Sequence, residues 1–390
     1  MSLNVYTRIG IYLAVISLLW LVIYVIVRIF RLDRRNLHIK PFLIMYKTAR
    51  FNKILVDLAN KHKEAWKYFS TLSVFLGFGL LLFSTYTLTE NIFKLFMKSE
   101  EAIGLVPILP GITVGFEPLI YILPAIIIGL TAHEMMHGIA AILENIPVES
   151  SGILAAFIIF GGFVEPNEEA FRRSKPLSKL RTLSSGPSSN LAVATITLIL
   201  LNVLFQQPQG LLVYSVSPDS PFYKLGLESW SLVSEINGVK VGVTKPSVPF
   251  ITPYQNPLKE LSKLNITDNV VVKTDKGVFN VSLGEFNGSL NVRFYVYPYS
   301  PSIFGDLIPK PVAFTCYLIL MYVCNINVAF AVFNMLPVYP LDGYGFVEVF
   351  LVKIKNRVLR NIATLCLNVF ALSLLVLNMG LTFLRFRILS

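Results

Sequence analysis

The sequence predicts a polytopic α-helical membrane protein with about six transmembrane helices and a small, mixed, β-rich domain outside the membrane. Of its 390 residues, 54% are hydrophobic and only 15% are charged, whereas a soluble domain of this size would carry about a quarter charged residues. Apolar runs long enough to cross a bilayer, which takes roughly 20 residues each, recur along the chain. One stretch between them alternates polar and apolar residues and contains proline and glycine turns, which is typical of short strands.

Six apolar stretches are candidate transmembrane helices. They cover residues 9–29, 69–89, 118–143, 187–206, 311–338 and 359–383. Their orientation follows from charge, because Lys and Arg concentrate in cytoplasmic loops. From Arg28 to Lys67 there are eleven Lys or Arg against three acidic residues, which places this loop inside and the N-terminus outside. We expect no nucleic-acid partner despite the net charge of +11, since no basic stripe interleaves with aromatic residues in a polar domain.

These stretches divide the chain into five parts. We expect an N-terminal membrane region of two helices with a basic cytoplasmic loop at residues 1–117, followed by the first part of a core at 118–206. An outer domain would follow at 207–298, a further core helix at 299–345 and a C-terminal membrane helix at 346–390. Residues 150–166 are apolar but too short to cross the bilayer. We interpret them as a re-entrant hairpin enclosed by protein, because lipid cannot satisfy an exposed strand edge. An interfacial segment is the alternative.

The stretch 118–143 has only three acidic or basic side chains, and they lie together as His133-Glu134-Met135-Met136-His137. Residues four apart share one face of a helix, so the two imidazoles can bind one metal ion while Glu134 lies beside its open position. Ionisable groups inside a membrane helix are costly unless they are compensated, and a bound Zn²⁺ compensates them. The alternative is a polar cluster that packs one helix against another.

A catalytic zinc site usually has a third protein ligand. Beyond residue 306 the only acidic residues are Asp342 and Glu348. We favour Asp342, because it follows the inner end of the fifth span, at the depth where the third span places His133 and His137. Gly343 and two nearby prolines would end the helix and let Asp342 turn inward. Glu348 is the rival ligand.

The combination of His-Glu-x-x-His in a membrane helix with a distant Leu341-Asp342-Gly343 resembles the site-2 protease family of intramembrane zinc metalloproteases. Gly186-Pro187-Ser188-Ser189-Asn190 is similar to the Gly-Pro-x-x-Asn element that opens the middle core helix of that family. The matching motifs extend over about residues 118–345. The first two spans and the last one match no motif of the family.

The outer domain resembles a PDZ module in Ser220-Pro221, Gly226-Leu227 and Ile236-Asn237-Gly238. It departs from that pattern at Glu228-Ser229-Trp230, where PDZ modules of this family often have a Gly-Asp turn. The departure puts the usual peptide-binding groove in doubt.

The resemblance implies that His133, His137 and Asp342 bind Zn²⁺ and that Glu134 is the catalytic base. It also implies that Asn190 and Asn334 line the path of the substrate, although amides at this depth can equally join neighbouring helices. A substrate helix must unwind before it is cut. We expect the edge of the hairpin near Phe160 and Gly161 to bind the unwound strand by strand addition.

The function expected is therefore regulated intramembrane proteolysis, in which transmembrane segments of membrane-bound substrates are hydrolysed by zinc-activated water. The partners would be these substrates and the lipid bilayer, with peptide or ectodomain contacts made by the PDZ-like domain. One alternative is a catalytically inactive scaffold or chaperone with a structural zinc site. Another is a channel or transporter, although the sequence lacks the repeated halves common in transporters.

The same topology predicts a multi-pass protein of the cell membrane, with the metal site near the cytoplasmic side and the PDZ-like domain outside. A prokaryotic source is favoured because the chain lacks the cysteine-rich insertion expected of animal relatives. Its Asn-x-Ser/Thr sequons favour an archaeon.

Overall fold

The computed structural model describes residues 5–31, 36–110, 112–156, 159–206, 209–216, 218, 223, 226–240, 269–282 and 295–386. These residues form two compact units. The larger unit joins residues 1–196 with 322–390, and the smaller one comprises residues 197–321.

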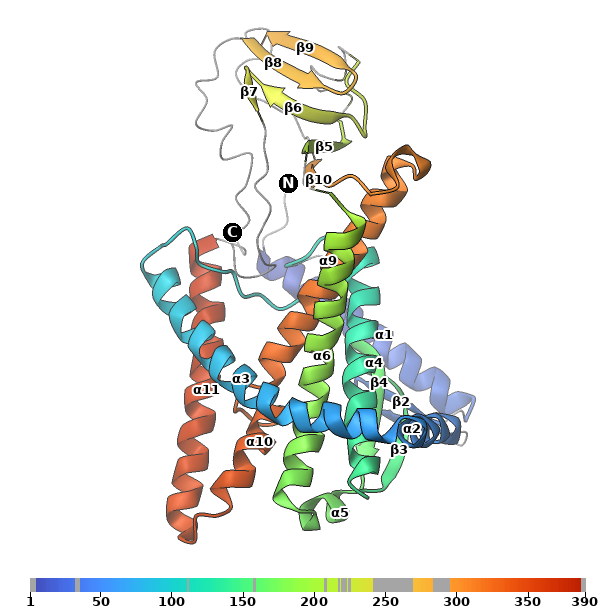
Figure 1. Cartoon of the computed structure of the whole chain (residues 1–390), viewed down its shortest axis with the longest axis vertical. Helices are drawn as coiled ribbons and strands as arrows, with labels where there is room; N and C mark the ends of the chain where they lie inside the picture. Colours follow the sequence, from blue (N-terminus) through green and yellow to red (C-terminus); the bar gives the residue numbers. More distant parts are fainter. Residues whose placement is uncertain are drawn as a thin grey trace. The chain divides into compact units, whose positions relative to one another are not determined.

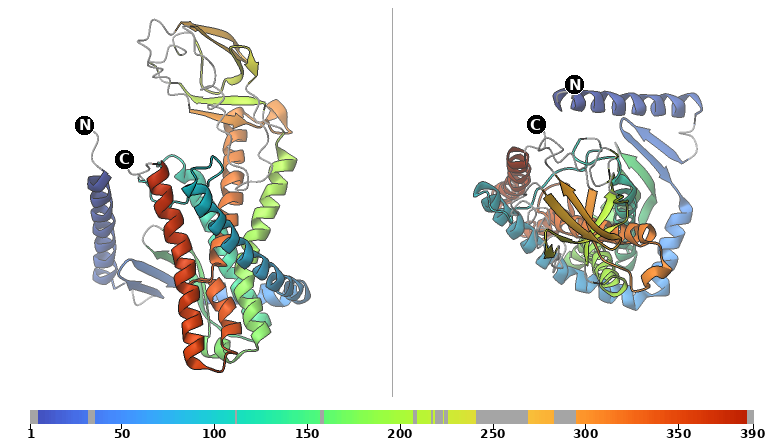
Figure 2. Two further views of the ribbon diagram at one scale, coloured as in Figure 1. Left: turned by 90° about the vertical axis from the view of Figure 1, so that its left-hand side faces the viewer. Right: turned by 90° about the horizontal axis from the view of Figure 1, so that it is seen from above.

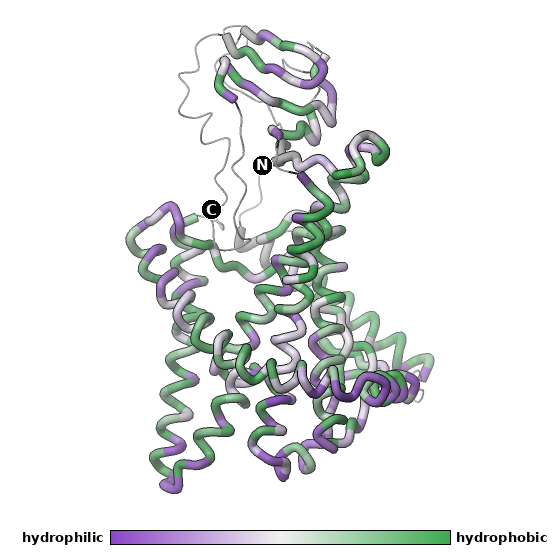
Figure 3. Tube along the Cα trace, in the orientation of Figure 1, coloured by the Kyte–Doolittle hydropathy of each residue, from purple (hydrophilic) through white to green (hydrophobic). Residues whose placement is uncertain are grey.

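Among the residues that the structure describes, six helices are long and apolar enough to cross a membrane, the number that the sequence predicts. They are α1 (Val5–Ile29), α3 (Lys63–Phe96), α4 (Leu119–Leu143), α6 (Pro176–Leu204), α9 (Lys310–Asn334) and α11 (Arg357–Phe386) (Figure 1). Hydrophobic residues dominate along them, whereas hydrophilic residues gather at helix ends and in the short helix α2 (Figure 3). This pattern fits a polytopic membrane protein.

Helix α6 begins eleven residues earlier than hydropathy predicts, at Pro176 instead of residue 187. Its first three turns are rich in Ser, Lys and Arg, so a hydropathy window does not detect them. The resemblance implied that the Gly-Pro-x-x-Asn element opens this helix. In the structure it does not. Instead, Pro187 lies inside it.

The expected hairpin is present, as the antiparallel strands β3 (Val148–Ala156) and β4 (Ile159–Pro166). It belongs to a larger sheet with the order β1-β2-β3-β4. Strands β1 (Leu37–Lys40) and β2 (Leu43–Lys47) come from the basic loop that follows α1. Strand β4 is an edge of this sheet and runs along α4.

Helix α2 (Ala49–Lys61) follows β2 and packs its apolar face inward. Leu55 and Ala59 are fully buried against Met136 and Ile139 of α4 and against Val164 of β4. These contacts help to hold α4 against the edge strand.

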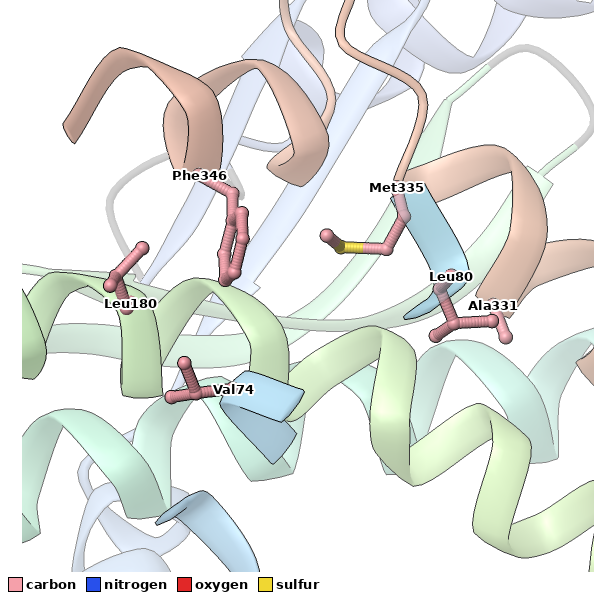
Figure 4. Close-up of a cluster of buried hydrophobic side chains, with 6 residues drawn as sticks. All are labelled: Val74, Leu80, Leu180, Ala331, Met335 and Phe346. Carbon is pink, nitrogen blue, oxygen red and sulfur yellow. The ribbon is translucent and has the colours of Figure 1, made fainter. Parts of the chain in front are cut away.

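A second hydrophobic cluster joins α3, α6, α9 and α10 (Asp342–Leu351). It contains Val74, Leu80, Leu180, Ala331, Met335 and Phe346, whose side chains point toward one another in Figure 4. Phe346 is fully buried. The cluster thereby anchors α10, the helix whose first residue is Asp342.

Helices α3 and α11 are joined by a buried amide pair. The Nδ2 atom of Asn91 donates to Oδ1 of Asn378 at 2.8 Å, and Nδ2 of Asn378 donates to the backbone oxygen of Leu88 at 2.9 Å. Both views in Figure 2 show the two helices side by side. The remaining short helix of this unit, α5 (Glu168–Arg173), leads into α6.

The smaller unit contains a β-sheet between the end of α6 and the start of α9. Its strands are β5 (Gly210–Ser215), β6 (Leu232–Ile236), β7 (Val239–Lys240), β8 (Asn269–Thr274), β9 (Gly277–Ser282) and β10 (Tyr295–Tyr299), and the 3-10 helix η3 (Gly305–Leu307) follows them. The strand order is β10-β5-β6-β8-β9, with β7 paired to β6.

Asn237 and Gly238 form the two-residue turn between β6 and β7, both with positive φ, which is the conformation that Asn-Gly favours in hairpins. The likeness to a PDZ module stays a prediction. Ser220-Pro221 lies outside the described residues.

Candidate metal centre

Helix α4 brings His133 and His137 onto one face, as the spacing of four residues predicts. Their Nε2 atoms lie 3.0 Å apart, and their rings meet edge to face with centroids 4.6 Å apart. His133 is buried, and His137 is largely so. Both rings therefore point their Nε2 atoms at the same place.

Asp342 reaches this place from the start of α10. Its Oδ2 atom lies 3.1 Å from Nε2 of His133 and 3.2 Å from Nε2 of His137. Gly343 makes this approach possible, because a Cβ atom there would lie 2.2 Å from the backbone oxygen of Met335.

The outer nitrogen of His133 is fixed by an amide. Its Nδ1 atom lies 2.7 Å from Oδ1 of Asn190, while Nδ2 of the same amide donates to the backbone oxygen of Gly129 at 2.8 Å and to Oδ1 of Asn327 at 2.9 Å. A carbonyl can only accept, so the amide must present its nitrogen to Gly129 and its oxygen to the histidine. His133 therefore donates from Nδ1 and leaves a lone pair on Nε2.

His137 is held in the same tautomer by a backbone group. Its Nδ1 atom lies 2.7 Å from the carbonyl oxygen of Thr182 on α6, and a carbonyl again requires a donor. The part of α6 before residue 187, which hydropathy does not detect, thus supplies one of the two groups that orient the histidines.

Three electron-pair donors consequently face one another, namely two imidazole nitrogens and a carboxylate oxygen. They repel each other unless a cation lies between them. Zinc bonds of about 2.0–2.1 Å in tetrahedral geometry would place ligand atoms about 3.3 Å apart, close to the 3.0–3.2 Å found here. These three residues form a group that could hold a metal ion, and their chemistry fits Zn²⁺.

Two other carboxylates that the sequence analysis considered are not members of the ligand group. Glu134 is half-buried, and its Oε2 atom accepts a hydrogen bond of 3.2 Å from the backbone N–H of Val164 on β4. Glu348, the rival ligand, is exposed and lines a cavity between α10 and α11. Glu134, adjacent to His133 in sequence, therefore binds the edge strand β4 and is not part of the ligand group.

Gly186 explains why the Gly-Pro-x-x-Asn element contains glycine. A Cβ atom at this position would lie 2.3 Å from Nε2 of His137, which is the atom that faces the ligand group. The backbone of α6 can approach His137 closely only because no side chain is present.

The predicted substrate residues lie in different surroundings. Asn190 is fully buried and its amide is already hydrogen-bonded at both ends. Asn334 is half-buried at the end of α9, and Asn327 of the same helix, which the sequence did not single out, is the residue that bonds Asn190. On β4, Phe160 is exposed, whereas Gly161 is buried against Leu130 of α4.

Comparison of the sequence with known proteins finds matches to a protein family and to individual proteins. The model of peptidase family M50 matches residues 121–377. An uncharacterized protein of Methanocaldococcus jannaschii is 27% identical over 355 residues, which cover 88% of this chain and 86% of that protein. A membrane-bound transcription factor site-2 protease homolog of Arabidopsis thaliana is 24% identical over 211 residues, which cover 52% of this chain and 40% of that protein.

Proposed function

The chain belongs to peptidase family M50, and from this premise we propose that it is an intramembrane zinc metalloprotease that cleaves transmembrane segments of membrane-bound substrates. The observation that carries the proposal is the convergence of His133, His137 and Asp342, with Glu134 beside them but outside the ligand group. A purely structural zinc site has no use for such a carboxylate, whereas a hydrolytic site requires a base.

The ligand group contains two imidazoles and one carboxylate, which leaves a fourth position for water or substrate. A zinc ion bound there would lower the pKa of its water toward about 7 and polarise the peptide carbonyl. Glu134 would accept the proton that the attacking water loses and would return it to the leaving amine. Asn190 and Thr182 would keep both histidines in the tautomer that presents Nε2 to the ion.

The edge strand β4 would hold the unwound substrate. In an antiparallel pair, alternate residues point their N–H and C=O groups toward the partner strand. Val164 donates its N–H to Glu134, away from β3, so Phe160 and Gly162 also direct their backbone groups away from β3. An extended substrate added at this edge would run toward Glu134, since the same strand binds that carboxylate.

The topology proposed from charge places the metal centre near the cytoplasmic side of a cell membrane, where water can reach it. The β-sheet of the smaller unit, PDZ-like in our interpretation, would lie outside. There it would contact peptides or ectodomains and exclude substrates whose ectodomains have not been trimmed. The archaeal relative supports an archaeal cell membrane as the setting.

The proposal is tested by incubating the purified protein in detergent with a single-span substrate that carries helix-breaking residues. We compare wild type, Glu134→Gln, and Glu169→Gln as a control, since Glu169 lies on an exposed turn of α5. The zinc content of each preparation is measured in parallel. We expect Glu134→Gln to lose cleavage by about 10²–10⁴-fold while it retains zinc, and the control to match wild type.

Two outcomes would contradict the proposal. If Glu134→Gln cut as fast as wild type, Glu134 would not be the base. If wild type bound zinc but left a panel of such substrates intact, the alternative of an inactive scaffold or chaperone with a structural zinc site would be favoured.

A further inference from the structure

A second site lies between α10 and α11, and none of the three proposed metal ligands lines it. A cavity of about 600 Å³ is lined by Tyr339, Tyr344, Glu348, Arg360 and Leu365, together with other residues of α10 and α11. This volume falls within the range of roughly 300–1,000 Å³ that is typical of small-molecule sites. Figure 1 shows the two helices side by side, joined by the short turn at residues 352–356.

Two opposite charges line the cavity without neutralising each other. Arg360 is half-buried, and its guanidinium forms no hydrogen bond or ion pair with any side chain in the described part of the chain. Glu348 faces the same space from α10 and interacts there with the hydroxyl of Tyr344. No ion pair joins Arg360 to Glu348 or to another described acidic group. A ligand with one negative and one positive group would satisfy both.

The cavity lies where the exposed surface of α11 changes from charged to apolar. Lys355 and Arg357, at the start of the helix, are exposed cations. One to three turns further on, the exposed side chains are apolar, among them Leu365 at 64% and Val369 at 55%. A helix that crosses a membrane changes its surface in this way at the depth of the lipid headgroups.

We propose that this cavity binds the headgroup of a zwitterionic phospholipid, with the phosphate at Arg360 and the ammonium group at Glu348. Arginine is well suited to the phosphate, because its planar guanidinium donates two parallel hydrogen bonds. The rings of Tyr339 and Tyr344, whose centroids lie 5.7 Å apart, offer aromatic faces to the ammonium group. The acyl chains would lie along the exposed apolar side of α11.

Native mass spectrometry of the intact protein in detergent tests this assignment. We titrate phosphatidylethanolamine, phosphatidylcholine and phosphatidylglycerol separately, against wild type, Arg360→Gln, Glu348→Gln, and Lys355→Gln as a control outside the cavity. Zinc content and thermal unfolding of each variant show whether its fold is retained. Soluble glycerophosphoethanolamine serves as a competitor that has the headgroup without the acyl chains.

We expect wild type to bind one ethanolamine or choline lipid about tenfold more tightly than the glycerol lipid, since the glycerol lipid has no ammonium group to pair with Glu348. Arg360→Gln should weaken all three lipids about tenfold, and Glu348→Gln should abolish the preference for the zwitterionic ones. The control should match wild type.

The proposal is overturned if Arg360→Gln binds lipid as wild type does, or if the glycerol lipid binds as tightly as the others. Competition by the soluble headgroup at the same concentration as the lipids would also overturn it, since the ligand would then be a water-soluble phosphate compound. If Arg360→Gln did not fold, Glu348→Gln would provide the test. The measured quantity would then be the ratio of its affinities for the zwitterionic lipids and for the glycerol lipid.

Discussion

The Nδ1 atom of His133 lies 2.7 Å from Oδ1 of Asn190, a residue on another helix and 57 positions further along the chain. Asn190 is oriented in turn by Asn327, whose Oδ1 accepts from it and whose Nδ2 donates to the backbone oxygen of Val323. All three side chains are buried. A relay of fixed amides thus reaches from α9 through α6 to a metal ligand on α4, and it leaves Asn190 without a free group for a substrate.

Breaking this relay should weaken zinc binding before it affects the fold. We expect Asn190→Leu to lower zinc affinity about 10–100-fold, as loss of a partner to a ligating histidine typically does. Asn327→Leu should have a smaller effect in the same direction, because the amide of Asn190 would lose one of its two orienting acceptors. Competition with a chelator of known affinity measures both.

Asn327→Asp is the matched control, since the protonated carboxyl can accept from Asn190 and donate to Val323 as the amide does. It should bind zinc nearly as wild type. If Asn190→Leu bound zinc with unchanged affinity, Asn190 would not position the ligand, and the role in substrate binding that the resemblance implied would be favoured again.

Gly186 should tolerate no side chain. We expect Gly186→Ala to weaken zinc binding by about tenfold or more, because a Cβ atom 2.3 Å from Nε2 of His137 must displace the ring, and overpacking of this kind costs about 1–3 kcal/mol. Gly79→Ala is the control, since no atom lies within 4 Å of the Cβ position there. Equal zinc contents and affinities of the two variants would show that α6 can move away from the centre.

Hydropathy predicted the six apolar helices, and motif spacing predicted that His133 and His137 lie together, because both features depend on local sequence. An apolar run of 20 residues specifies a span by itself, and residues four apart in a helix share a face. Asp342 could be chosen over Glu348 because few acidic residues follow position 306. In the structure the carboxylate of Asp342 lies within 3.2 Å of both histidines, and its role as a metal ligand stays a prediction.

The rest depends on how distant segments pack. Helix α9 carries Asn325, Asn327 and Asn334, and only the rotation of this helix against α6 decides which of them meets Asn190. Strand β2 pairs with β3, which lies more than 100 residues further along the chain. Strands β1 and β2 have only four and five residues in a basic loop, and so short a pattern does not specify which strand will pair with it. The early start of α6 also cannot be predicted from hydropathy. Polar side chains in its first three turns, such as Ser178 and Thr182, are buried against other parts of the protein.

The sheet of the smaller unit can be removed by joining the ends of two paired strands, with loss of the ring contacts that Tyr214 and Trp230 make with Phe314 of α9. Gly210 and Tyr299 are paired at the ends of β5 and β10, so a two-residue Asn-Gly turn can join them in place of residues 211–298. We expect this variant to retain zinc and to cut a short single-span substrate at a rate similar to wild type. It should also cut a substrate with a folded ectodomain, which wild type should leave intact.

The comparison of these two substrates separates a filter from a structural role. Loss of both activities together with loss of zinc would indicate that the sheet is needed to assemble the core. Retained activity with unchanged selectivity would contradict the proposed filter while leaving the proposed chemistry untouched.

The edge of β4 offers the sharpest test of how substrate is held. Phe160 directs its N–H away from β3, so Phe160→Pro removes one donor from the open edge and preserves the ladder to β3, as proline is tolerated on edge strands. We expect cleavage to fall about tenfold, since a bound strand would lose one hydrogen bond and meet the proline ring. Zinc content should be unchanged. Gly161 points its N–H toward β3, so Gly161→Pro would damage the sheet itself and is less informative.

Strand β1 supplies the matched control, because it forms the opposite edge of the same sheet. The N–H of Lys47 bonds the backbone oxygen of Asn36, so by alternation Ile39 directs its N–H outward, as Phe160 does on β4. Ile39→Pro therefore makes the same chemical change at an edge that no proposed substrate touches, and it should cut as wild type. Equal losses in both variants would indicate general damage to the sheet. No loss in Phe160→Pro would mean that substrate does not add to β4 at this residue, and the hydrogen bond from Val164 to Glu134 would then serve only to orient the base.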